Sequence, residues 1–131
     1  MGLFSKKKKY EASSEKEAWV AILYGLMASD GEIADEELDK LVNFCSTSKH
    51  FDGVDVVAYF KEVGNFARSN GFETVLKEAP KYVSGHGADL MDLLIDMTKA
   101  DGFILSEEVE VLEELCEQLG VDWSSVEARL N

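Results

Sequence analysis

A short pattern of residues occurs twice in this chain, 71 positions apart, and it constrains the fold more than any other feature. It reads Asp-Gly-x-Ile-x-x-x-Glu, once from Asp30 to Glu37 and once from Asp101 to Glu108. The apolar positions on both sides match at the same shift, so the repeat extends over residues 19–45 and 90–116. A match of this length indicates a repeated supersecondary unit rather than a chance coincidence of four residues.

Each copy has the periodicity of two helices joined by a loop. In the first copy the apolar residues before the turn have the i, i+3, i+4, i+7 spacing of one helical face: Trp19, Ile22, Leu23 and Leu26. The corresponding face after the turn holds Leu38, Leu41, Val42 and Cys45. Asp35 and Ser106 are the predicted N-caps of the second helices, and Ser14 with Glu17 predicts a capping box at the start of the first.

Two more helical stripes lie between the copies, at residues 56–67 and 72–79. Pro80 is predicted to break or kink the second of these helices, and Gly120 is predicted to end the last long helix. A single proline and few β-branched runs favour helices throughout. The sequence therefore predicts an all-α fold, a compact helical bundle in which two pseudo-symmetric helix-loop-helix repeats flank a central helical pair.

Charge divides the chain into a flexible basic arm, residues 1–12, and a single acidic domain, residues 13–131. The formal net charge is −13, but four of the 13 basic residues are the run Lys6, Lys7, Lys8 and Lys9, and residues 11–131 alone carry −17. Such a domain repels nucleic acid, because binding there depends on Lys and Arg neutralising phosphates. It attracts cations and basic partners instead.

The lysine run of the arm predicts weak attraction to an anionic membrane surface, with Leu3 and Phe4 entering the lipid. The alternative is a solvated tail. No apolar run approaches the roughly 20 residues that span a bilayer, and the first residues lack the apolar stretch and cleavage site of a signal peptide. We therefore expect a cytoplasmic protein, with the inner face of the membrane as a location that the arm allows.

Carboxylates of the repeated turn are the candidate metal ligands: Asp30, Glu37, Asp101 and Glu108. Glu36 and Glu107 are second candidates. Folding the chain through the turn brings the Asp and the Glu of each copy toward one point, where two carboxylates about 4 Å apart repel by roughly 4 kcal/mol at an effective dielectric of 20. A hard divalent cation with oxygen ligands would turn that cost into a gain.

These turns are not complete EF-hands. When the first copy is aligned with that loop, Asp30, Gly31 and Glu37 fall on its later ligand and turn positions. The first two ligand positions are Leu26 and Ala28, which cannot coordinate calcium, and the second copy fails at the same places. Each turn therefore supplies at most half of a calcium site. Either the two turns pool their carboxylates in one site, or each turn binds a cation weakly with water completing the coordination shell.

Cys45 and Cys116 are the two cysteines, and both fall on the inward stripes of their helices. In a cytoplasmic protein we expect reduced core thiols rather than a disulfide. With His50 and His86 as the two histidines, a zinc site of the Cys/His type is not expected. The suspected cation is therefore Ca²⁺ or Mg²⁺ rather than Zn²⁺.

The repeated turn also has a purely structural explanation. Glycine adopts positive φ freely, and acidic residues in the first turn of a helix gain roughly 0.3–1 kcal/mol each from the helix dipole. On this interpretation the protein is a metal-free acidic scaffold that recruits basic partners; an atypical calcium sensor is a further alternative. No nucleophile elbow, phosphate-binding glycine loop or nucleophile-base pair is present, so we expect no enzyme.

The segments "SDGEIADEE" and "KADGFILSEEVEVLEELCEQLGVD", with "VVAYFKEV" between them, resemble the tellurite-resistance TerB family over nearly the whole chain after the arm. A related domain occurs joined to membrane-anchored J-domain co-chaperones, and no J-domain is present in this sequence. The resemblance implies an all-helical fold with pseudo-twofold repeats and a role in tellurite and related stress resistance. It also implies cation binding through the motif acids and work with membrane-bound and calcium-binding partners of one resistance complex.

Overall fold

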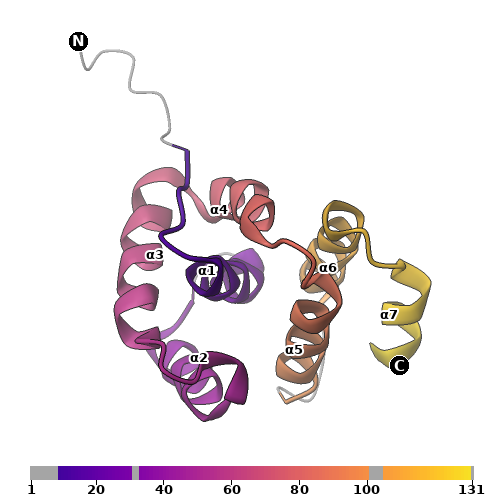
Figure 1. Cartoon of the computed structure of the whole chain (residues 1–131), viewed down its shortest axis with the longest axis horizontal. Helices are drawn as coiled ribbons and strands as arrows, with labels where there is room; N and C mark the ends of the chain where they lie inside the picture. Colours follow the sequence, from indigo (N-terminus) through magenta and orange to yellow (C-terminus); the bar gives the residue numbers. More distant parts are fainter. Residues whose placement is uncertain (1–8, 31–32, 101–104, 131) are drawn as a thin grey trace.

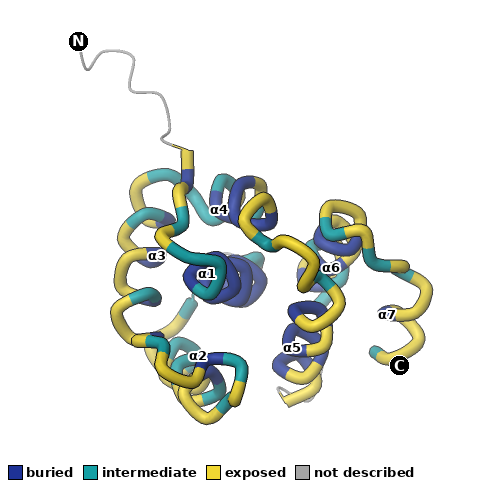
Figure 2. Tube along the Cα trace, viewed as in Figure 1, coloured by how far each residue is buried: buried dark blue, intermediate teal, exposed yellow. Residues whose placement is uncertain are grey.

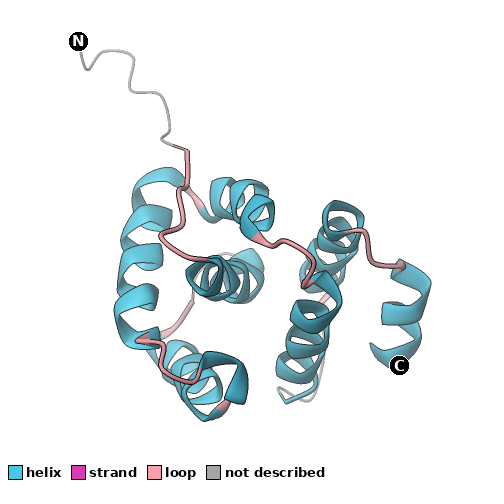
Figure 3. Ribbon diagram, in the orientation of Figure 1, coloured by secondary structure: helices cyan, strands magenta, loops and turns pink. Residues whose placement is uncertain are grey.

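The structure is a computed structural model that describes residues 9–30, 33–100 and 105–130, and for Asp30 the backbone alone. Every regular element in these residues is a helix (Figure 3), which confirms the predicted all-α fold. The α-helices are α1 (Glu15–Met27), α2 (Asp35–Thr47), α3 (Val56–Asn70), α4 (Phe72–Glu78), α5 (Gly87–Ala100), α6 (Ser106–Leu119) and α7 (Trp123–Leu130). Short 3-10 helices connect some of them: η2 (Ala28–Asp30), η3 (Lys49–Phe51) and η4 (Ala79–Tyr82).

Helix α1 lies at the centre of the bundle (Figure 1), where α2, α3, α4, α6 and η4 all contact it. Every residue of α1 from Glu17 to Met27 is buried (Figure 2). Apart from Glu17 this stretch is apolar on all sides, and a helix of that kind must be covered on every face. The pair α3 and α4, predicted to be the central pair flanked by the two repeats, instead packs on the outside of α1, because α1 is the helix that is apolar on every face.

The other long helices are amphipathic and bury one face each. In α5 the buried residues include Leu90, Leu93, Leu94 and Met97, which stand 71 positions after the predicted stripe of the first copy. Leu41 and Cys45 of α2 are buried, as are Leu112 and Cys116 of α6. The apolar periodicity of the sequence therefore identified the inward faces of both helix pairs correctly.

Local signals set the ends of several helices as predicted. The Ser14 hydroxyl accepts a hydrogen bond of 3.1 Å from the backbone N–H of Glu17 and caps α1. Helix α4 ends at Glu78, so that Pro80 stands in the 3-10 helix that follows. Gly120 ends α6 with a φ of 72°, a left-handed conformation that glycine adopts without the strain of a Cβ.

Candidate functional site

The glutamate of each repeated turn occupies the same structural position. Helices α2 and α6 begin at Asp35 and Ser106, and Glu37 and Glu108 are the third residues of the two helices. The Glu37 Oε1 atom accepts a 3.1 Å hydrogen bond from the backbone N–H of Ala34, and Glu108 Oε1 accepts one of 3.0 Å from Leu105. Each glutamate therefore reaches back across the helix start and satisfies the amide of the residue that precedes the helix.

This geometry corrects the predicted N-caps of the two helices. Asp35 and Ser106 are the first helical residues, and the caps are Ala34 and Leu105, which make no side-chain capping bond. Both caps have extended backbone, with φ/ψ of −74°/155° and −81°/151°. The glutamate carboxylate supplies the capping hydrogen bond, which is why an Asp or Ser one residue later is not needed for that purpose.

The two glutamates differ in burial. Glu108 is 7% exposed, whereas Glu37 is half-buried. Their neighbours Glu36 and Glu107, the second candidates, are exposed on the first turns of α2 and α6. A ligand approaching from solvent can therefore reach Glu37 with less rearrangement than Glu108.

The side chains of the two motif aspartates lie outside the part of the chain that the structure describes. Asp30 is the last residue of η2, for which the backbone alone is described, and Asp101 lies outside the described residues. Helix η2 contacts α6, so the segment that leads into the first repeated turn lies against a helix of the second repeat. Within the described residues no group of three or more His, Cys, Asp or Glu side chains is arranged to hold a metal ion.

A buried carboxylate, which the sequence indicated only as part of a capping box, lies at the start of α1. Glu17 is 3% exposed, and it accepts hydrogen bonds from the Tyr10 hydroxyl (2.7 Å), the Ser13 hydroxyl (3.0 Å) and the Ser13 backbone N–H (3.2 Å). Tyr10 is 4% exposed and packs edge-on against Phe66 of α3. The packed part of the chain therefore begins before the predicted domain boundary at residue 13, because Tyr10 and Glu17 satisfy each other.

Glu62 of α3 adds a second carboxyl group to this cluster. A hydrogen bond with Glu17 and the repulsion between the two charges raise the pKa of Glu62, and burial beside Glu17 raises the pKa of Tyr10. One signal in the sequence pointed here: Glu17 follows the cap Ser14 by three residues. This spacing predicted a local capping role for Glu17. Its neighbours Tyr10 and Glu62 are brought to it by the tertiary fold.

We predict that Glu62→Gln raises the melting temperature modestly at neutral pH. Because the folded-state pKa of Glu62 is raised, its ionised form opposes folding at pH above that pKa, and the native state gains relative stability as pH falls through it. Glutamine removes the charge at every pH. The difference from wild type, measured by thermal melts from pH 7 to pH 4, should therefore shrink as the pH falls. A difference that stays constant over this range would contradict a raised pKa of Glu62.

Both cysteines are free and buried, as expected for core thiols. Burial raises the pKa of Cys45 to about 12 and, together with the charges of Asp122 and Glu113, that of Cys116 to about 11. Thiols with such pKa values are almost entirely protonated at neutral pH, and the thiolate is the reactive form.

We therefore predict that a thiol reagent labels the native protein about a hundredfold more slowly than the urea-unfolded chain, since thiolate and access are both lacking. A colourimetric thiol assay at pH 8 measures both rates. Fast labelling of the native protein at either cysteine would show that the site opens locally.

The lysine run of the arm lies mostly outside the described residues. Lys6, Lys7 and Lys8 lie outside the described residues, and Lys9 is exposed. Among the described helices none has the length and apolar character needed to cross a membrane.

Comparison with known proteins gives one informative match. The model of a family described as "Tellurite resistance protein TerB" matches residues 16–130. The match begins inside α1 and ends with α7, so it includes both repeated turns and every helix between them. No curated protein and no solved structure matches the chain.

Proposed function

Because this chain belongs to the TerB family of tellurite-resistance proteins, we propose that it is a cation-binding helical interaction module of a tellurite or metal-stress resistance system. In this proposal it acts in the cytoplasm or at the inner face of the membrane, with other proteins of that system, and it catalyses no reaction. The observation that carries the proposal is the equivalent placement of Glu37 and Glu108, each at the third position of the helix after a repeated turn.

Glu37 and Glu108 have the chemistry of ligands for a hard divalent cation. Each uses Oε1 to accept a backbone N–H, which fixes the direction of the side chain. Within the described residues the second carboxylate oxygen of Glu37 has no hydrogen-bond partner, so it can coordinate a metal without losing one. Ca²⁺ and Mg²⁺ prefer such oxygen ligands, whereas structural Zn²⁺ sites are built mainly from Cys and His.

The surrounding charge both favours and opposes a cation. The net charge of −13 concentrates cations near the protein. The N-terminal end of a helix carries a partial positive charge that opposes a cation by roughly 0.3–1 kcal/mol. A site that pools carboxylates of both repeats, with Asp30 and Asp101 contributing, overcomes this opposition more easily than a single glutamate.

A metal-free acidic scaffold is the second candidate function, and one observation favours it. Glu37 and Glu108 already have a structural role as the capping acceptors of α2 and α6. That role explains why a glutamate recurs at this position without any ligand. The acidic surface would then recruit basic segments of partner proteins directly.

The test is a calorimetric titration of the chelator-stripped protein with Ca²⁺, Mg²⁺, Mn²⁺ and Zn²⁺. Glu37→Gln, Glu108→Gln and the double variant are titrated alongside, because the glutamine amide oxygen still accepts the capping N–H while the charge is lost. Glu114→Gln is the matched control, since it removes one exposed charge from α6 away from its start. We expect saturable binding of Ca²⁺ or Mg²⁺ to the wild type and to the control.

The variants distinguish the arrangements of the site. Loss of all binding in either single variant would mean one pooled site, and halved stoichiometry in each would mean two separate half-sites. Absence of binding at roughly millimolar cation, an affinity of only about −4 kcal/mol, would overturn the cation proposal and favour the scaffold.

A further inference from the structure

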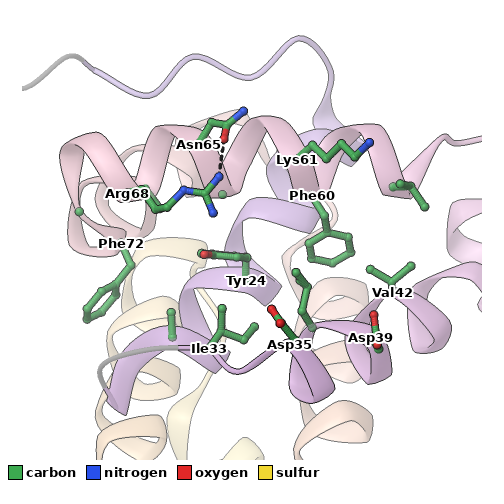
Figure 4. A pocket seen from close by; sticks show the side chains of 16 residues that line it. Tyr24, Ile33, Asp35, Asp39, Val42, Phe60, Lys61, Asn65, Arg68 and Phe72 are labelled. Atoms are coloured by element: carbon green, nitrogen blue, oxygen red, sulfur yellow. Dashed lines mark hydrogen bonds between the residues drawn. The ribbon is translucent and has the colours of Figure 1, made fainter.

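A groove of about 890 Å³ lies between α2 and α3, with α1 below it (Figure 4). Its lining is largely apolar and includes Leu38 and Val42 from α2, Phe60 from α3 and Phe72 from α4. Val57, which is 49% exposed, stands on its α3 side and is one of the few large apolar side chains left open to solvent in the described chain. We propose that this groove binds an amphipathic helix of a partner protein that carries a carboxylate on the edge facing α3.

The first observation for an occupant is an unpartnered phenol. Tyr24 is 7% exposed and lines the groove, and its hydroxyl makes no hydrogen bond to any described residue. No fully buried side-chain polar atom in the described chain lacks a partner, so this hydroxyl must open into the groove. An almost buried donor without a partner is unfavourable, so a ligand that supplies a hydrogen-bond acceptor to the Tyr24 hydroxyl would bind more tightly.

The second observation is an unpaired cation beside that phenol. Figure 4 shows Arg68 extending from α3 above Tyr24, with its guanidinium hydrogen-bonded to the side chain of Asn65 on the same helix. Although the chain has 26 acidic residues, Arg68 forms no ion pair within the described residues. A carboxylate entering the groove would meet the guanidinium and the phenol together, and a charged hydrogen bond of this type is stronger than a neutral one.

The third observation is the glycine in the middle of α3. Gly64 has a helical backbone, and a Cβ there would meet only Tyr24, at 3.8 Å from its hydroxyl and 3.9 Å from its ring, which is ordinary contact. The packing of the protein itself therefore does not require glycine. Glycine inside a helix costs about 0.5–1 kcal/mol relative to alanine. Gly64 lines the groove, so the absence of a side chain there leaves more room for an occupant beside Tyr24.

The charges on the two rims favour a helix as the occupant. Lys61 and Arg68 stand on the α3 rim, seven residues and so about two helical turns apart. Asp35 and Asp39 stand on the α2 rim, one turn apart, and none of these four charges has an ion pair in the described structure. A helix with an acidic edge and a basic edge complements both rims, whereas an anionic lipid chain would leave the aspartates unmatched.

The test is a titration of the isotope-labelled full chain with a synthetic peptide, in the presence of a chelator. NMR monitors the chemical shifts of the backbone amides during the titration. The peptide is a helix of about 14 residues with leucine at i, i+3, i+4 and i+7, glutamate along one edge and lysine along the other. We expect saturable shifts of the α2 and α3 amides that line the groove. A peptide with serine at the leucine positions should cause none.

Variants of the groove residues test whether the peptide binds in the groove. Tyr24→Phe and Arg68→Gln should each weaken the peptide about tenfold, because each removes a partner of the carboxylate. Arg129→Gln is the matched control on α7 and should bind like the wild type. Gly64→Ala should weaken the peptide while raising the melting temperature, a combination that loss of folding cannot produce.

Three results would overturn the proposal: no shifts at roughly millimolar peptide, shifts that lie away from the groove, or equal binding to the wild type and to all three groove variants. Dodecanoate is titrated in parallel. If it displaces the peptide and binds more tightly at the same residues, the groove is a site for a small anionic amphiphile and the helix assignment is wrong. Because the chelator is present throughout, none of these results depends on whether the protein binds cations.

Discussion

Replacing Gly25 with valine is expected to destabilise the protein by about 3 kcal/mol, at the upper end of the range for overpacked cores. Gly25 lies in the central helix α1, and even a Cβ at this position would come within 2.6 Å of the Leu76 Cγ atom of α4. Valine adds two further methyl groups to the same place, so α1 and α4 must move apart or Leu76 must leave its rotamer. Urea unfolding monitored by circular dichroism measures the change.

A second substitution tests whether this contact is the cause. Leu76→Ala removes the atoms that the new side chain meets, so the double variant should be more stable than the sum of the two single changes predicts. Additive effects would mean that Gly25 is required for another reason. Gly64→Ala on α3 is the contrasting case, because there the added methyl group has room and the expected change is stabilising.

Replacing Glu17 with alanine is expected to cost about 1–3 kcal/mol, because the change leaves the buried Tyr10 hydroxyl without its acceptor. The same substitution removes the acceptor of both Ser13 hydrogen bonds, which hold the chain just before α1. We therefore expect faster amide hydrogen exchange at residues 10–14 in addition to a lower free energy of unfolding.

Glu17→Gln is the matched control for this prediction. Glutamine keeps an acceptor for Tyr10 and removes the repulsion with Glu62, so it should cost much less than alanine. If glutamine were as destabilising as alanine, the charge of Glu17 rather than its hydrogen bonds would hold the segment. Thermal and urea unfolding of both variants at neutral pH decide between the two causes.

The sequence predicted the helix pairs well because local periodicity determines them. The stripe Trp19, Ile22, Leu23 and Leu26 is buried, and the second helices begin 71 residues apart, as the repeat implies. The predicted caps were wrong by one residue. Asp35 is a good capping residue by type, but the backbone N–H of Ala34 donates to the Glu37 carboxylate, so the helix start is capped one position earlier.

The candidate site was predictable only in part. The sequence proposed Glu37 and Glu108 from their spacing, and the structure places each at the third position of its helix. It gave no indication that both would serve as capping acceptors. It also missed the partners of Glu17, because Tyr10 and Glu62 lie on segments whose approach to α1 no local pattern encodes.

The sequence by itself determined the all-α class, the inward faces and the ends of several helices, because each depends on residues within a few turns of one another. The acidic character of the domain follows from its composition. Tertiary structure alone decided that α1 is the central helix, that the Glu17 carboxylate is buried against the Tyr10 hydroxyl and that α2 and α3 leave a groove between them. The physical reason is that helix packing depends on how side chains from distant segments fill shared space. Gly25 and Gly64 are both glycines inside helices, and the sequence does not distinguish them. Only their neighbours in the fold do: an added Cβ would clash with Leu76 at Gly25 and would have room beside Tyr24 at Gly64.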